Sequence, residues 1–320
     1  MYMFKSRMLD AIKQSHYIPP IWLAILIAIG FVYGGGYLGA FSMFPIGILM
    51  YMLTSTSNPT VGGSSNSNFL VFWKQFSLSF ELFVFFFTGL VVFLWVRYLE
   101  KRPFSSLGFY KQDWFKNLLK GFLIGAVQFS MVVVFLLVTG TGSLKLGQVN
   151  LQSLVFVVAI IPFCLLQGWP EELVTRGWLF PMVSAKSNIF IGILISSALF
   201  AALPLFNSGV TVLPIINIVL YGVFACFLML KYDNMWVLAG MHGAWNFVQG
   251  NIYGIQVSGQ GASTSILNYS SKSSVDLLSG GAFGAKGSIF ASIVLIGCIV
   301  YLYWSLKKEN RLPQVLIFKK

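Results

Sequence analysis

The sequence predicts an all-α fold, a polytopic bundle of about eight transmembrane helices. Of the 320 residues, 57% are hydrophobic and only 9% are charged, whereas soluble domains carry roughly 25% charged residues. The mean hydropathy is +0.80. Long apolar runs recur along the chain, and several reach the ~20 residues that a helix needs to cross a bilayer. A soluble globular protein is therefore excluded.

The apolar runs give the order of the predicted spans. The first run, within residues 18–53, is longer than one span needs, and the three glycines at 34–36 favour a bent or tilted helix, or a span followed by a re-entrant piece. A short helix over residues 170–183 is predicted to begin directly after the fourth span. The remaining spans are predicted at residues 78–96, 118–139, 151–168, 188–206, 212–230, 235–251 and 288–305.

The composition divides the chain into four parts. Residues 1–17 form a basic N-terminal segment, and residues 18–140 hold the first spans with a polar loop at 54–77. Residues 150–255 contain the polar motifs described below and are predicted to form the core. Residues 256–320 hold most of a Gly/Ser-rich outer loop, the last span and a basic tail.

The net charge of +12 indicates a membrane surface rather than nucleic acid. If the N-terminus is cytoplasmic and there are eight spans, the outer loops hold only Lys74, Lys145, Lys272 and Lys286, and nearly all other basic residues lie inside. This distribution follows the positive-inside rule. We therefore expect a multi-pass protein of the cell membrane with both termini in the cytoplasm, in contact with anionic lipids and without a nucleic-acid partner.

The stretch at residues 167–177 places two adjacent carboxylates and an arginine directly after an apolar run. Charges at membrane depth are costly and tend to mark function. Pro170 suits the first turn of a helix, where the helix dipole favours the negative charges of Glu171 and Glu172. Glu172 and Arg176 are spaced i, i+4 and can pair, which leaves Glu171 available as a general base. The alternative is a solvated ion pair at a helix start.

A second polar pair lies in the middle of the seventh predicted span. His242 and Asn246 are spaced i, i+4 and share one helix face. A single histidine on an apolar helix is more often a hydrogen-bonded core residue than a catalytic one. A His/Asn pair in a chain that also carries an intramembrane Glu-Glu pair favours function. The only other histidine, His16, lies in the basic N-terminal segment and is interpreted as a surface residue.

The motif Glu171-Glu-Leu-Val-Thr-Arg176, followed by His242-Gly-Ala-Trp-Asn246, resembles the CAAX-protease and bacteriocin-processing (CPBP, or Abi) family of intramembrane proteases. The layout of residues 97–109 also looks like that of bacterial members. The resemblance implies that Glu171 activates a water for attack on a peptide carbonyl. It implies that Glu172 and Arg176 support the site. His242 and Asn246 would stabilise the oxyanion that forms.

The sequence departs from the family's pattern at one position. The family has a Phe-x-x-x-His motif on the intervening span, whereas this chain has Phe200 followed by Pro204 in place of the histidine. In the family that histidine partners the first glutamate, so Glu171 lacks this helper and activity is in doubt. Without it, and without a His-Glu-x-x-His pattern, the donors for an ordinary zinc site are missing. No metal or other cofactor is therefore predicted.

Three functions remain open from the sequence. The first is an intramembrane endopeptidase that acts on a membrane-associated peptide or protein. The second is an inactive family member that binds and regulates a membrane partner, such as a sensor kinase or a bacteriocin-type peptide. The third, a transporter with Glu171 and His242 as a proton relay, ranks lowest because the chain shows no repeated halves. Glu81, near the outer end of the second span, is interpreted as an interfacial residue.

Overall fold

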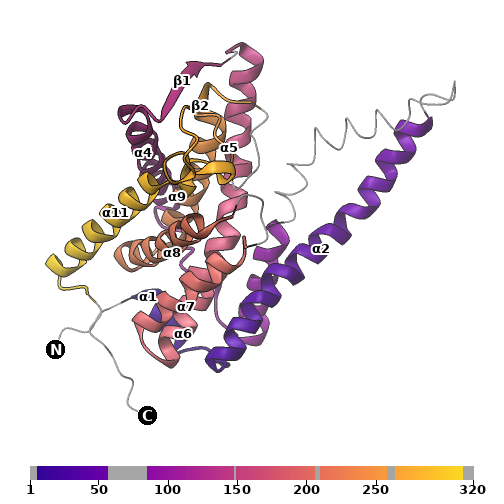
Figure 1. Cartoon of the computed structure of the whole chain (residues 1–320). Helices are drawn as coiled ribbons and strands as arrows, with labels where there is room; N and C mark the ends of the chain where they lie inside the picture. The colour runs from indigo at the N-terminus through magenta and orange to yellow at the C-terminus, as the bar shows by residue number, and fades with distance from the viewer. Residues whose placement is uncertain (1–5, 57–84, 148, 206–209, 258–263, 313–320) are drawn as a thin grey trace.

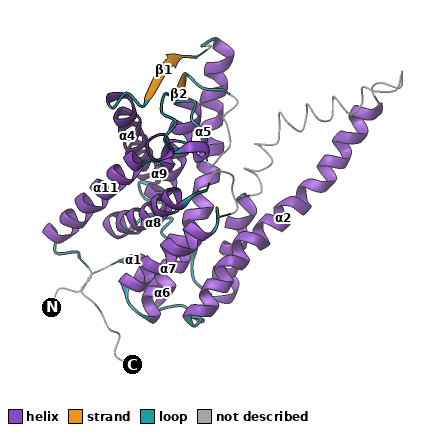
Figure 2. Cartoon of the chain, in the orientation of Figure 1, coloured by secondary structure: helices purple, strands orange, loops and turns teal. Residues whose placement is uncertain are grey.

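The computed structural model describes residues 6–56, 85–147, 149–205, 210–257 and 264–312 (Figure 1). It is 76% helical, and the described residues contain a single two-stranded sheet (Figure 2). The predicted class, a helical membrane protein, is confirmed at this level. The sheet was not predicted. It pairs β1 (Gly142–Leu146) with β2 (Leu267–Ser271) in antiparallel register, and so joins two loops that are far apart in the sequence.

The long helices carry the fold, and short 3₁₀ and π-helical turns connect or extend them. The α-helices are α1 (Arg7–Ile12), α2 (Ile21–Thr56), α4 (Trp114–Val138), α5 (Leu151–Glu172), α6 (Phe180–Lys186), α7 (Ile189–Ala202), α8 (Val212–Tyr232), α9 (Met235–Phe247), α10 (Asp276–Ser279) and α11 (Ile289–Lys308). The π-helical segments are η1 (Trp95–Leu99), η3 (Leu173–Leu179) and η4 (Val248–Ile252), and the 3₁₀ turns are η2 (Phe104–Leu107), η5 (Gly281–Phe283) and η6 (Ala285–Gly287).

Five helices of the described chain are long and apolar enough to cross a membrane. They are Ile21–Leu49, Trp114–Val138, Leu151–Lys186, Val212–Tyr232 and Ile289–Lys308. Two shorter apolar helices, Phe85–Leu99 and Ile189–Ala202, fall on the second and fifth predicted spans. The seventh predicted span, at residues 235–251, coincides with α9, which has only 13 residues. Eight spans therefore stay a prediction, and Glu81 and most of the predicted loop at 54–77 lie outside the described residues.

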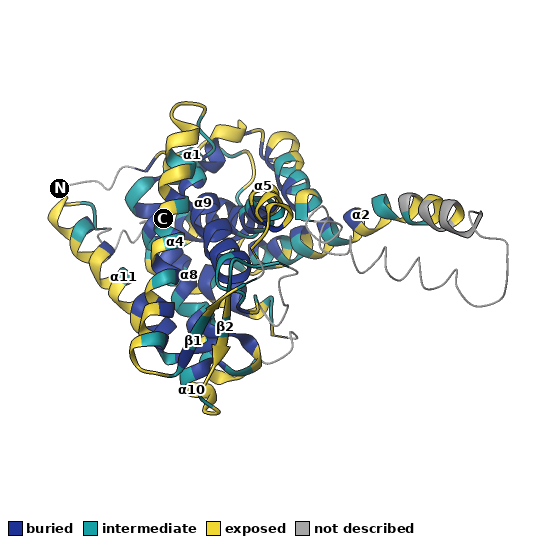
Figure 3. Cartoon of the chain, turned by 90° about the horizontal axis from the view of Figure 1, so that it is seen from above, coloured by how far each residue is buried: buried dark blue, intermediate teal, exposed yellow. Residues whose placement is uncertain are grey.

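The first apolar run forms one continuous helix, α2, without a break at residues 34–36, so the expected alternative of a span followed by a re-entrant piece is wrong. The alternative of a bent or tilted helix stays a prediction. A break inside lipid would leave backbone N–H and C=O groups without partners. Gly35 serves packing instead: a Cβ there would lie 2.3 Å from the Cα of Thr88. Much of α2 is exposed and apolar, with Phe41 76% exposed, and its far half extends away from the other helices (Figures 1 and 3).

The prediction that Pro170 begins a new helix is wrong. Pro162 and Pro170 both lie inside α5, which continues into η3 and α6 without a loop. Each proline removes one helical hydrogen bond, but a loop at this depth would leave more backbone groups unpaired. Glu171 and Glu172 thus lie at the C-terminal end of α5. The favourable helix dipole expected from an N-terminal first turn does not act on them.

Helix α9 lies at the centre of the bundle, and almost all of its residues are buried (Figure 3). Glycines bring its neighbours close, as small residues do in membrane bundles. On α4, a Cβ at Gly121 would lie 2.0 Å from the carbonyl oxygen of Val237, and one at Gly125 would lie 2.1 Å from that of Met241. The position of α9 is therefore fixed by backbone contact.

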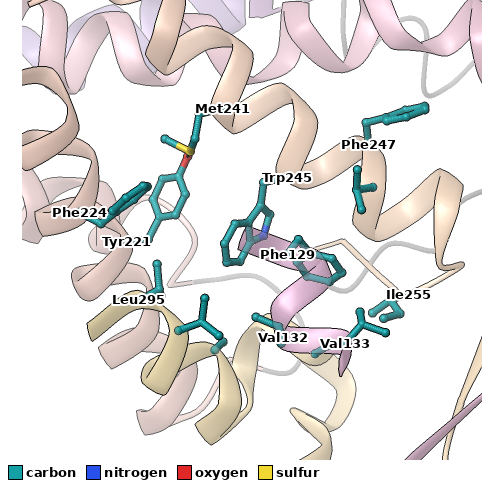
Figure 4. Close-up of a cluster of buried hydrophobic side chains, with 14 of the residues drawn as sticks. Phe129, Val132, Val133, Tyr221, Phe224, Met241, Trp245, Phe247, Ile255 and Leu295 are labelled. Atoms are coloured by element: carbon teal, nitrogen blue, oxygen red, sulfur yellow. The ribbon is translucent and has the colours of Figure 1, made fainter. Parts of the chain in front are cut away.

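A large hydrophobic cluster fills the space between α4, α8, α9 and α11 (Figure 4). The rings of Phe129 and Trp245 meet edge to face at 5.3 Å, and Tyr221 contacts Trp245 in the same way at 5.8 Å. Tyr221 also points its hydroxyl at the sulfur of Met241, 3.3 Å away. The cluster is thus continuous with the polar residues described in the next subsection.

A buried ion pair joins the segment after η1 to η3. Glu100 and Arg102 are 0% and 1% exposed. The Nε of Arg102 donates to Glu100 Oε2 at 2.8 Å, and its Nη1 donates to Ser106 Oγ at 3.0 Å. The indole of Trp178, in η3, donates to the other carboxylate oxygen of Glu100 at 2.5 Å. Glu100 therefore links this segment to the helix that carries Arg176.

Replacement of Glu100 by glutamine tests this link. Glu100→Gln leaves the guanidinium of Arg102 buried without its counter-charge, and loss of one partner of a buried pair costs about 3–5 kcal/mol. We expect a clearly lower melting temperature in detergent. Arg97→Gln, an exposed neighbour, is the control and should melt like the wild type. Equal melting of all three proteins would contradict a structural role for Glu100.

Candidate active site

The five polar residues singled out from the sequence come together where α5 meets α9. Glu171 and Glu172 end α5, Arg176 lies in η3, and His242 and Asn246 share α9. The two helices approach so closely that a Cβ at Gly168 would lie 2.9 Å from the Cβ of His242. On α9, a Cβ at Gly243 would lie 2.9 Å from the Cα of Leu165. This glycine contact brings the two motifs together.

His242 lies between the two glutamates. Its Nδ1 is 2.9 Å from Glu172 Oε1, and its Nε2 is 3.7 Å from Glu171 Oε2. The Glu171 side chain is 29% exposed, whereas that of Glu172 is completely buried. The two neighbouring carboxylates therefore have different environments, and only Glu171 is within reach of water.

Glu172 is held by positive charge and by hydrogen bonds. Arg176 Nη1 lies 3.2 Å from Glu172 Oε2, and both side chains are 0% exposed. The Tyr221 hydroxyl donates to Glu172 Oε1 at 3.4 Å. The guanidinium carbon of Arg176 lies 4.2 Å from the centre of the Phe200 ring, a cation–π contact. The i, i+4 pairing expected from the sequence is present in the structure.

This network defines the proton on His242. Glu172 is ion-paired with Arg176, so it is a carboxylate and can only accept hydrogen bonds. His242 Nδ1 therefore carries a proton, which it donates to Glu172. The opposite nitrogen, Nε2, faces Glu171. His242 is thereby fixed in one orientation with one nitrogen directed at the exposed carboxylate.

Asn246 lies one turn further along α9 and does not hydrogen bond to either glutamate in the structure. Its amide donates to Gln167 Oε1 across a long 3.5 Å, and the residue is 9% exposed. Both His242 and Asn246 line a cavity of about 60 Å³, which is large enough for water. The other residues lining the cavity are Phe200, Asn217, Ile218, Tyr221, Trp245, Lys286 and Leu295.

Pro204, which stands in the position of the family's second histidine, lies in the turn after α7. It does not line the cavity. Phe200 of the same motif does line it, and its ring stacks on Tyr221 at 5.5 Å. Phe200 of this stretch therefore lies at the site, whereas Pro204 does not.

Three residues at the site were not predicted from the sequence. Tyr221 and Asn217 lie on α8 at i, i+4 spacing, and two polar residues so placed on an apolar helix were a usable signal. Lys286 comes from the Gly/Ser-rich loop predicted at residues 254–287 and lies in η6. Its sequence surroundings give no sign that it faces a cavity.

In this helical membrane protein a histidine and an asparagine line an internal cavity, and a partly exposed carboxylate lies beside the histidine. These are features of an intramembrane protease. Residues 152–248 match the model of a family described as type II CAAX prenyl endopeptidase, Rce1-like. The match includes all five predicted residues and confirms the resemblance to the CPBP family. No curated protein and no solved structure matches the chain.

The described residues contain no group of three or more His, Cys, Asp and Glu side chains that could hold a metal ion. The expectation that the protein needs no cofactor stays a prediction, and a chelation experiment below addresses it.

The glycine contact between α5 and α9 can be tested directly. In Gly168→Ala the new methyl group would meet the rigid root of the His242 side chain, so the two motifs must move apart. We expect lower thermal stability and loss of any activity that depends on the site. Gly30→Ala is the control, because a Cβ there meets nothing within 4 Å and alanine is the better helix former. A Gly168→Ala protein that behaves like Gly30→Ala would contradict the close approach.

Proposed function

We propose that this protein is an intramembrane endopeptidase in which Glu171 activates a water for attack on a peptide bond. The family match supports a CAAX-type intramembrane protease in general terms. The single observation that carries the finer assignment is the difference between the two glutamates. Glu172 is committed to Arg176 and His242, whereas Glu171 is partly exposed.

In the proposed reaction, Glu171 accepts a proton from the water. At the same time the oxygen of that water forms a bond to the carbonyl carbon of the substrate. The carbonyl oxygen becomes an oxyanion, which accepts hydrogen bonds from the amide of Asn246 and from Nε2–H of His242, whose ring carries a proton on both nitrogens in this step. The C–N bond then breaks. The proton held by Glu171 passes to the leaving nitrogen, so that the products are a carboxylic acid and an amine.

Glu172, Arg176 and Tyr221 act indirectly in this proposal. They hold His242 by its Nδ1 and keep its other nitrogen directed at the reacting groups. A charged network of this kind stays in place through the reaction, which is the condition for efficient electrostatic stabilisation.

The substrate class follows from the family and from the position of the site. A membrane-associated peptide or protein is the proposed substrate, because the family is one of proteases and the site lies among apolar helices. The family description names prenyl CAAX substrates. A reporter peptide that ends in a prenylated Cys and three further residues, and the same peptide without the prenyl group, distinguish prenyl-dependent from general cleavage.

We further propose that the chain lies in the cell membrane with eight spans and both termini in the cytoplasm, surrounded by anionic lipid on that side. In this orientation β1, β2 and the segment before α11 are on the outer side. The basic residues at the end of α11, Lys307 and Lys308, would then face the cytoplasm.

The decisive experiment compares the wild type with Glu171→Gln in membranes. Loss of a general base lowers the rate by about 10²–10⁴-fold, so Glu171→Gln should be essentially inactive on either reporter peptide. Mass spectrometry of small membrane-associated peptides from cells should show products that form only with the wild type. Glu309→Gln, which removes an exposed carboxylate at the end of α11, should cleave normally. Full activity of Glu171→Gln would exclude the proposed mechanism.

A second candidate function is supported by Pro204. Because this chain lacks the family's second histidine, the alternative proposal is a proteolytically inactive protein that binds and regulates a membrane partner, such as a sensor kinase or a bacteriocin-type peptide, through the same cavity. Identical peptide profiles for the wild type and Glu171→Gln, with the protein still needed for a cellular phenotype, would favour this regulatory function over proteolysis.

Metal dependence is tested with the purified protein. The proposed mechanism uses the side chains of Glu171, His242 and Asn246 alone, so cleavage of a reporter peptide should persist after EDTA treatment and dialysis. Loss of cleavage that returns on addition of a divalent cation would show that a metal takes part and would require a revised mechanism.

A further inference from the structure

The guanidinium of Arg176 is held by few directional contacts for a charge that is completely buried. Its Nη1 lies 3.2 Å from Glu172 Oε2. Its Nε and Nη2 have no hydrogen-bond partner among the described residues. The rings of Phe200 and Tyr221 face the guanidinium, but ring contacts attract a charge without fixing the direction of its N–H groups. The group that fixes Nη1 therefore decides whether Arg176 stays in place beside Glu172.

Thr175 supplies a second contact for this nitrogen. Its Oγ1 accepts a hydrogen bond from Arg176 Nη1 at 2.7 Å and donates one to the main-chain carbonyl oxygen of Glu171 at 2.6 Å. A guanidinium can only donate, and a hydroxyl has one hydrogen to give, so the direction of both bonds is determined. One buried hydroxyl thus joins the backbone of Glu171 to the side chain of Arg176.

The backbone of Thr175 is itself fixed from two sides. It lies in η3, where the N–H of Phe180 donates to the carbonyl oxygen of Thr175, five residues earlier. From α7, Ser196 Oγ donates to the same carbonyl oxygen at 2.8 Å, and both Thr175 and Ser196 are 0% exposed. Short π-helical segments within longer helices are frequent at functional sites. The hydroxyl of Thr175 is therefore held where Arg176 meets it.

A purely local explanation covers only part of this arrangement. A threonine inside a helix commonly bonds to the carbonyl four residues back, and the bond to Glu171 alone would be no more than that. The bond from Arg176 is different, because it uses the same nitrogen that pairs with Glu172. The Glu172 carboxylate in turn accepts from His242 Nδ1 at 2.9 Å. A continuous chain of buried polar contacts therefore runs from Thr175 to His242.

We propose that Thr175 is a positioning residue whose hydroxyl fixes Arg176 against Glu172 and, through them, the orientation of His242. This inference rests on the proposed function and adds to it a residue that does not line the cavity. Without the hydroxyl, Nη1 keeps Glu172 as its single polar contact and the guanidinium can turn. The carboxylate that holds His242 then loses its fixed counter-charge.

The first test measures cleavage of whichever reporter peptide the wild type accepts, in proteoliposomes. Thr175→Val keeps the branched shape of the side chain and removes the hydroxyl. It should lower kcat by about tenfold or more with little change in KM, the effect of losing one hydrogen bond to a charged group. Thr175→Ser keeps the hydroxyl and should retain most of the activity. Ser197→Ala removes a buried hydroxyl that has no hydrogen-bond partner among the described residues and should cleave like the wild type.

Two results of this test would overturn the proposal. If Thr175→Ser lost as much activity as Thr175→Val, the hydroxyl would not be the reason for the effect. If Thr175→Val raised KM and left kcat unchanged, Thr175 would influence substrate binding rather than the reacting groups. Melting temperatures in detergent show whether any loss comes from unfolding.

A milder variant serves if Thr175→Val does not fold. Ser196→Ala removes the side-chain donor to the carbonyl of Thr175 and leaves the hydroxyl of Thr175 in the protein. It should lower kcat by a smaller factor than Thr175→Val, again without a change in KM. Equal kcat for Ser196→Ala and its neighbour Ser197→Ala would then count against the proposal.

The second test needs no activity and therefore separates this inference from the proposed function. The chain has two histidines, and His16 is exposed, so NMR of protein with isotope-labelled histidine reports on two rings. In the wild type, the Nδ1–H of His242 should give a downfield proton signal that exchanges slowly, because it donates to a buried carboxylate. Thr175→Val should shift or broaden this signal, whereas Thr175→Ser should preserve it. The His16 signals should be the same in all three proteins.

The outcomes of the NMR experiment are independent of cleavage. An unchanged His242 signal in Thr175→Val would overturn the proposal even if the protein proved to be a protease. If the wild type cleaved neither reporter peptide and the His242 signal still changed as expected, the proposed function would fail, and the positioning of His242 by Thr175 would stand.

Discussion

The close contact between α5 and α9 is the constraint on which the site depends. Gly168 and Gly243 let the two backbones approach until the root of His242 lies against α5, and this places one imidazole against both glutamates. In lipid there is little hydrophobic driving force between helices, so close van der Waals packing of small residues has to hold them. The same principle fixes the far side of α9, where glycines of α4 contact its carbonyl groups.

The second constraint is that backbone groups inside a membrane must find their partners within the helix. It explains why α2 passes through three glycines without a break and why α5 continues through Pro170. The continuation has a consequence for the site. The glutamates project from the middle of a long helical element, α5 to α6, so their positions are fixed from both sides by packed helix. The π-helical segment η3 then places Arg176 beside Glu172.

The surroundings of the two motifs are the third element, and they draw on segments far apart in the chain. Glu172 is neutralised locally by Arg176, four residues later. Lys286, more than a hundred residues distant, lines the same cavity as His242, and its backbone carbonyl is held by Asn217. A site assembled in this way links the packing of α8 and α11 to the chemistry at the end of α5. The Phe200 ring, which covers the Arg176 guanidinium, adds α7 to the same arrangement.

The sequence by itself determined the class of the protein and the residues to examine. Composition and apolar runs are enough for a helical membrane protein, because the energetics of lipid depend on local hydrophobicity, and the two motifs are local i, i+4 pairs. Tertiary structure decided the rest. The continuation of the helix through Pro170, the different exposure of Glu171 and Glu172, and the place of Lys286 all depend on contacts between distant segments. Helix packing sets those contacts, and periodicity along one helix carries no information about its neighbour.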